Sequence, residues 1–122
     1  MDTLRQRRPR VQDAAHLAWI RTLPCLVTGR REGIEAAHVR YSDPRFAKRQ
    51  AGIGEKPDDR WTVPLHHETH RTGPEAQHNS NERAWWVARG IDPVMVAAAL
   101  YANSGDDDAA HQILLTARAN AA

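Results

Sequence analysis

The histidines of this chain constrain its fold more than any other feature, because four of the seven lie within thirteen residues. That stretch follows directly on the strand-like run WTVPL at 61–65. Neutral imidazole is a common ligand of zinc and similar ions, and residues four apart share one face of a helix. Chance accumulation is the alternative. We expect a strand leading into a metal-binding turn with these histidines: His66, His67, His70 and His78.

The size of the chain, 122 residues, fits one domain with a modest core. We place that domain at residues 12–122, after a flexible basic arm at 1–11. Cys25 is the only cysteine, so no intrachain disulfide forms, and residues 1–10 have no apolar segment suited to a signal peptide. No apolar run reaches the roughly 18 residues that a membrane span needs. We therefore expect a cytoplasmic protein without a membrane partner.

Positive charge gathers in the first half of the chain. Residues 1–60 hold 13 Lys and Arg against 8 Asp and Glu, whereas residues 61–122 hold 4 against 7. A basic half of this kind attracts a phosphate backbone, because each cation that meets a phosphate releases counterions. An ordinary solvated surface explains the charge alone equally well. Likewise, the arm at 1–11 either follows a nucleic-acid backbone or is an inert tail.

Apolar spacing and turn residues outline the elements. Residues 12–23 suit a short helix. The runs at 25–29 and 34–39, separated by a polar turn, suit a β-hairpin with His38 near the end of its second strand. Residues 40–60 are expected to form a long loop, 75–89 a helix that ends before Gly90, and 92–120 two further helices. Trp85 and Trp86 are neighbours on a helix, so we expect packing, with one ring partly exposed or available for base stacking.

Several segments, in order, resemble the HNH, or ββα-metal, endonucleases. Within that family the chain is similar to the Ref-like nucleases of phages and prophages, which are associated with recombination. The resemblance covers about residues 23–93. Its landmarks are LPCLVTG (23–29), AAHVR (36–40), GIGEKPDD (52–59), WTVPL (61–65) and QHNSNERAWW (77–86).

The resemblance implies an α+β fold with a small β-hairpin and a helix around one divalent ion, Mg, Mn, Ni or Zn. This ββα-metal core would span about residues 23–90, with helices on either side. His38 would be the base that takes a proton from water while the metal stabilises charge on the phosphoryl oxygens. His70 and His78 match the metal-binding histidines, and His66 or His67 could substitute.

The resemblance also assigns residues to nucleic-acid binding. Two glycines in the 52–59 loop would allow close approach of the backbone, and Lys56 would neutralise the scissile or a neighbouring phosphate. A plain surface loop is the alternative for this segment. The residues expected to meet nucleic-acid phosphates are Arg40, Lys48, Arg49 and Lys56.

Departures from the family pattern affect two metal sites. Relatives hold a structural zinc with two cysteines and a Cys-x-x-His pair, but the corresponding positions here are Cys25, Thr28, His66 and Thr69. Threonine is a poor zinc ligand, so we expect that site to be lost and Cys25 to be a small buried apolar residue. Ala37 stands where many relatives have a metal ligand. Glu35 or Asp43 could supply an oxygen ligand instead.

The sequence therefore predicts a metal-dependent endonuclease that hydrolyses double- or single-stranded DNA in a bacterial or phage-infected cell. A recombinase or another phage protein is a possible partner implied by the resemblance. The main alternative is a non-catalytic accessory protein that binds nucleic acid on the same fold. A third reading is a metal-stabilised interaction module without a nucleic-acid role. Loss of activity on removing His38 or the divalent ion separates the first from the others.

Overall fold

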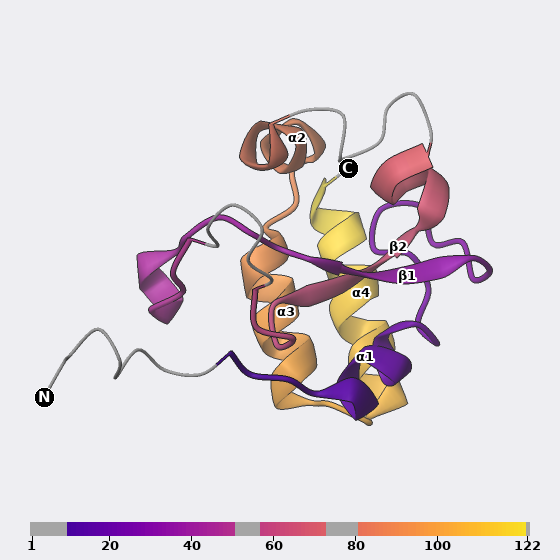
Figure 1. Cartoon of the computed structure of the whole chain (residues 1–122). Coiled ribbons are helices and arrows are strands. Elements are labelled where there is room, and N and C mark those ends of the chain that lie inside the picture. Colours follow the sequence, from indigo (N-terminus) through magenta and orange to yellow (C-terminus); the bar gives the residue numbers. More distant parts are fainter. Residues whose placement is uncertain (1–9, 51–56, 73–80, 122) are drawn as a thin grey trace, which may run out of the picture.

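A two-stranded antiparallel sheet organises the fold, with helices packed around it (Figure 1). The computed structural model describes residues 10–50, 57–72 and 81–121. The α+β class predicted from the sequence is confirmed. Along the chain, the described elements are α1 (Ala14–Ile20), β1 (Ile34–His38), the 3₁₀ turn η2 (Pro44–Phe46), β2 (Thr62–His66), the π-helical turn η3 (Glu68–Thr72), α2 (Glu82–Arg89), α3 (Pro93–Ala102) and α4 (Asp107–Ala121).

The strand pairing differs from the predicted hairpin. β1 pairs with β2, so that Ile34 lies opposite His66 and His38 lies opposite Thr62. Residues 25–29 do not form a strand, because the Gly29 N–H turns back to the Cys25 carbonyl at 2.9 Å. The expectation of a hairpin between 25–29 and 34–39 is therefore wrong. The extended run at 61–65, by contrast, is confirmed as the greater part of β2.

Pro64 lies in the middle of β2 without breaking the sheet. Its carbonyl accepts the Leu26 N–H at 2.8 Å, from the side of β2 that faces away from β1. In an antiparallel strand the N–H and C=O of one residue point to the same side, so the missing proline N–H removes no bond to β1. Residues 25–29 thus cover the outer edge of β2, although they are not a strand themselves.

Local capping signals place the helices after the sheet. Asp92 caps α3 by accepting the Met95 N–H, as predicted, and α4 begins at the predicted acidic run and continues to Ala121. α2 ends as expected at Gly90, whose φ of 68° closes the helix. Its start differs: Asn81 caps it through the Ala84 N–H, so α2 begins at Glu82 and not at residue 75. Residues 73–80 lie outside the described residues.

The core lies between the sheet and the C-terminal helices. α3 packs on β2 and α4 packs beside α3, while α1 contacts both strands (Figure 1). All five residues of β2 are buried. Trp85 and Trp86 are both buried, 5% and 2% exposed, with ring centroids 4.8 Å apart. The expectation that one ring is partly exposed is wrong, and Arg89 of the same helix covers the Trp85 ring with its guanidinium 3.6 Å from the ring centroid.

The helices of the described residues are all too short or too polar to cross a membrane.

Candidate active site at the end of β1

The end of β1 presents His38 on the side of the strand away from the core. Ala37 and Val39 are 3% and 1% exposed and point into the core, whereas His38 and Arg40 are only partly buried. The Val39 N–H continues the sheet by donating to the Trp61 carbonyl at 2.8 Å. Because side chains alternate along extended backbone, His38 and Arg40 share the outer face.

Asp59 holds the His38 ring from the opposite segment. Its Oδ1 lies 2.9 Å from His38 Nε2, and its side chain is 4% exposed. Because Asp59 engages Nε2, the other nitrogen, Nδ1, is the one that can take a proton in this arrangement. The pair is therefore a histidine oriented by a carboxylate, the geometry of a general base with its positioning group.

The Asp59 carboxylate has two further donors. Arg10 Nη2 donates to Oδ1 at 2.8 Å, and the Asp13 N–H donates to Oδ2 at 2.8 Å. Burial acts to raise the pKa of this carboxyl. The hydrogen bonds from His38 and the Asp13 amide, together with the charge of Arg10, outweigh burial and lower the pKa below its ordinary value. Asp59 is therefore a stable anion beside His38.

The segment before α1 is anchored at this site. Arg10 Nε donates to the Pro57 carbonyl at 3.0 Å, and the Val11 N–H donates to Asp58 Oδ1 at 2.8 Å. The Asp59 N–H returns a bond to the Val11 carbonyl at 2.9 Å. Arg10 and Val11 are thus not part of a flexible arm as expected; residues 1–9 lie outside the described residues.

Two of the predicted metal ligands, His66 and His70, lie toward the other end of the sheet. His66 ends β2 opposite Ile34, four residues from His38 on β1, a separation of about 13 Å along the strand. His66 is 2% exposed, and its Nδ1 accepts the Glu68 N–H at 3.1 Å. His70 lies in η3, so the expectation that His66 and His70 share one helical face is wrong. The structure does not bring these two histidines to His38.

The carboxylates considered as oxygen ligands are engaged by cations. Glu35 contacts Arg71 at 2.6 Å and His70 Nδ1 at 2.8 Å, and the Arg71 bonds lower its pKa to about 2. Asp43 is bound by Arg45. Across residues 10–50, 57–72 and 81–121, no three His, Cys, Asp or Glu side chains form a group that could hold a metal ion. His78 and Lys56, both assigned through the resemblance, lie outside these ranges.

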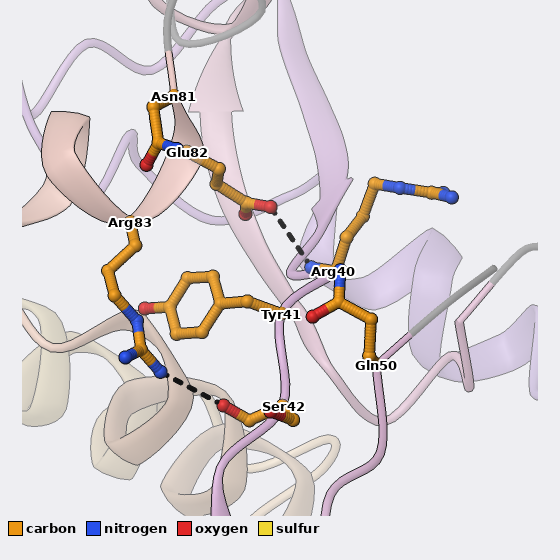
Figure 2. Close-up of a pocket in the computed structure, with 7 residues that line it drawn as sticks. All are labelled: Arg40, Tyr41, Ser42, Gln50, Asn81, Glu82 and Arg83. Atoms are coloured by element: carbon orange, nitrogen blue, oxygen red, sulfur yellow. Dashed lines mark hydrogen bonds between the residues drawn. The ribbon is translucent and has the colours of Figure 1, made fainter. Parts of the chain in front are cut away.

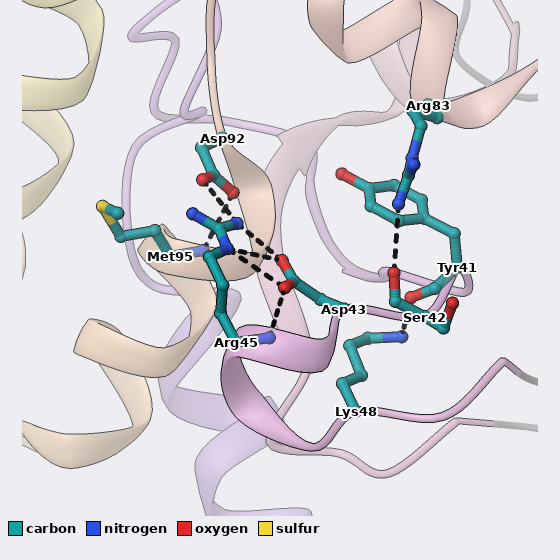
Figure 3. Close-up of polar contacts among 8 residues, drawn as sticks. All are labelled: Tyr41, Ser42, Asp43, Arg45, Lys48, Arg83, Asp92 and Met95. Atoms are coloured by element: carbon teal, nitrogen blue, oxygen red, sulfur yellow. Dashed lines mark hydrogen bonds and ion pairs between the residues drawn. The ribbon is translucent and has the colours of Figure 1, made fainter.

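The cations predicted to meet nucleic acid differ in exposure. Lys48 is 4% exposed and donates its Nζ to the Tyr41 carbonyl (Figure 3). The rings of Tyr41 and Trp61 lie about 6 Å from its Nζ. Burial lowers its pKa to about 8. Lys48 therefore supports the loop and is not available to a phosphate, contrary to expectation. Arg49 is exposed and Arg40 is partly exposed, so both remain accessible.

Cys25 is fully buried, as expected for a small apolar residue. Its Sγ accepts the Thr28 N–H at 3.4 Å, and its carbonyl accepts Arg118 Nη1 at 2.9 Å. Hydrogen bonds from the turn and from α4 hold this segment.

A polar pocket adjoins the site beyond Arg40. It has a volume of about 490 Å³ and opens between the segment after β1 and the first turn of α2 (Figure 2). The sequence reasoning missed this pocket. Its lining residues are Arg40, Tyr41, Ser42, Gln50, Asn81, Glu82 and Arg83.

Three residues of this region were missed as functional candidates: Arg10, Asp59 and Arg83. Asp59 closes the 52–59 landmark, and this was the one available signal. The contacts of His38 with Asp59 and of Arg10 with Asp59 join residues 21 and 49 positions apart. Comparison of the chain with family models, with curated proteins and with solved structures gives no significant match in any of the three.

Proposed function

We propose that this chain is an HNH-like, divalent-metal-dependent endonuclease that hydrolyses phosphodiester bonds of DNA, with His38 as general base. The observation that carries the proposal is the 2.9 Å contact between His38 Nε2 and the buried Asp59 carboxylate. The His38 side chain is 22% exposed at the strand end and is held in place by Asp59, so it can contact a substrate without losing its orientation. The chain order of two paired strands and then a helical turn, β1, β2 and η3 with the 3₁₀ turn η2 between the strands, also supports it.

In the proposed reaction, Nδ1 of neutral His38 accepts a proton from water as the water oxygen attacks phosphorus. The P–O bond to the leaving sugar oxygen breaks, and that oxygen takes a proton from solvent. The imidazolium that forms is stabilised by Asp59, to which Nε2–H donates. Arg10 keeps Asp59 ionised by adding a positive charge 2.8 Å from Oδ1. Asp59 and Arg10 are positioning residues, since neither touches the reacting atoms.

The divalent ion enters the proposal through the family resemblance. His66 and His70 do not complete a donor set for such an ion among the described residues. In the related chemistry an ion neutralises charge on the phosphoryl oxygens. The cleavage assay therefore tests several divalent ions in turn.

Cleavage of supercoiled plasmid and of single-stranded DNA by the purified chain tests the proposal, with magnesium, manganese, nickel and zinc supplied in turn. We expect nicking with at least one ion and a loss of about 100-fold or more in His38→Ala, the usual worth of a general base. His111→Ala is the matched control, because His111 lies in α4 and takes no part in the site. Equal rates for His38→Ala and wild type would exclude His38 as the base.

A non-catalytic nucleic-acid-binding protein is the second candidate. It is favoured by the placement of His38 at the opposite end of the sheet from His66 and His70. Under this reading the chain binds DNA with a salt-dependent affinity but leaves it uncut with every ion, and His38→Ala binds as well as wild type.

A further inference from the structure

The pocket beyond Arg40 has walls that are fixed before any ligand binds. Lys48 Nζ donates to the Tyr41 carbonyl, and Arg83 Nη2 donates to the Ser42 carbonyl at 3.1 Å (Figures 2 and 3). Arg45 bridges Asp43 and Asp92, with its Nη2 2.8 Å from Asp92 Oδ2 (Figure 3). These bonds join residues 41–43 to the starts of α2 and α3, so binding costs little reorganisation.

Arg83 is the best-placed cation of the pocket. Its guanidinium lies 4.8 Å from the centroid of the Tyr41 ring, and its side chain is exposed. A guanidinium has five N–H donors, and the bond to Ser42 uses one of them. The remaining donors form the planar fork that matches two oxygens of one phosphate.

The charges of the lining favour an anion. Arg40 and Arg83 are positive, and among the lining residues that the structure describes Glu82 is the one carboxylate. Glu82 accepts the Arg40 N–H at 3.1 Å. Burial raises the pKa of the Glu82 carboxyl, which disfavours the negatively charged form of that residue. An anion that enters the pocket therefore meets net positive charge.

The position of the pocket identifies the anion. Arg40 lies two residues beyond His38 on the same outer face, a step of about 7 Å. A nucleic-acid strand carries one phosphate per nucleotide, so a step of this length places Arg40 within reach of a phosphate next to the scissile one. We propose that this pocket binds a phosphodiester of the substrate strand beside the one that His38 cleaves, with Arg83 as its main ligand. This placement rests on the proposed function of His38.

Fluorescence anisotropy with a short fluorescein-labelled single strand, as DNA and as RNA of one sequence, tests the assignment. All proteins carry His38→Ala, so that nothing is cut during the measurement. We expect Arg83→Ala to bind about tenfold more weakly and to lower the slope of log affinity against log salt by about one. Arg31→Ala is the matched control, because Arg31 is exposed in the turn at the opposite end of β1. Its affinity stays within about twofold of the parent.

Arg83→Lys separates phosphate binding from a structural effect. Lysine keeps the charge, so the salt slope returns to the parent value, whereas part of the affinity stays lost without the planar fork. The assignment is wrong if Arg83→Ala and Arg31→Ala behave alike, if Arg83→Lys does not restore the slope, or if the parent binds neither strand. If Arg83 behaves as expected but wild type never cuts DNA, the nuclease proposal fails and the phosphate pocket stands. If wild type cuts DNA but Arg83→Ala leaves the affinity and the salt slope unchanged, the phosphate pocket is wrong and the nuclease proposal stands.

Discussion

Replacing the Asp59 carboxylate tests the contacts that hold the candidate base. Asp59→Asn keeps the shape but removes the charge, and an amide accepts from one side only. Of the three donors, His38, Arg10 and the Asp13 amide, at least one then faces an N–H₂ group. A hydrogen bond to a charged group contributes about 1.5–3 kcal/mol. Arg10 and His38 are 27% and 22% exposed and regain some water, so we expect a loss of about 2 kcal/mol near neutral pH.

The pH dependence of that loss has a definite sign. The pKa of Asp59 is lowered on folding, so its contribution is full above its ordinary value of 3.8 and is lost as pH falls through the lower folded value. The stability gap between wild type and Asp59→Asn therefore closes on acidification below about pH 4. Urea unfolding followed by tryptophan fluorescence measures the gap at each pH.

A neighbouring carboxylate provides the control for Asp59→Asn. Asp58→Asn also removes one charge, yet it keeps an oxygen to accept the Val11 N–H, and its ion partner Arg60 is 3.7 Å away. We expect it to cost less than about 1 kcal/mol. Equal costs for the two variants, or a gap for Asp59→Asn that persists in acid, would refute the reasoning.

Two further substitutions test the supports of the sheet and the loop. Gly33→Ala should be clearly less stable than Gly105→Ala by thermal unfolding. Both glycines have positive φ (65° and 89°), but only at Gly33 would a Cβ lie 2.9 Å from His67 Cδ2. Equal losses of stability for the two variants would contradict this reasoning. Burial lowers the pKa of Lys48 to about 8 in the folded chain, so between about pH 8 and 10 the unfolded chain binds more protons and the stability of wild type should rise with pH. Lys48→Met should lack this rise in urea titrations. A pH slope unchanged in Lys48→Met would show that another group is responsible.

Local signals predicted most elements of the fold. The capping aspartate at 92, the glycine at 90 and the acidic run before α4 act within one helical turn, so the residues themselves reveal them. The pairing of β1 could not be obtained in this way. Alternation shows that residues 34–38 are extended, but not which extended run they meet, and β2 begins 24 positions after β1 ends.

The candidate site follows the same division. The strand position of His38 follows from the local pattern and its candidate role from the family resemblance, but the burial of Lys48 follows from neither, because a lysine in a polar loop is ordinarily exposed. Its ammonium is held by a carbonyl and two rings that the fold supplies.

The sheet itself limits how this chain can act. His38 with Asp59 occupies one end of β1, and Glu35 with His70 and Arg71 occupies the other. Because β1 is fixed by its pairing with a fully buried β2, the two ends cannot approach each other without breaking the core. A metal that assists His38 must therefore be held by groups that reach the His38 end, and not by His66 and His70 as they are placed.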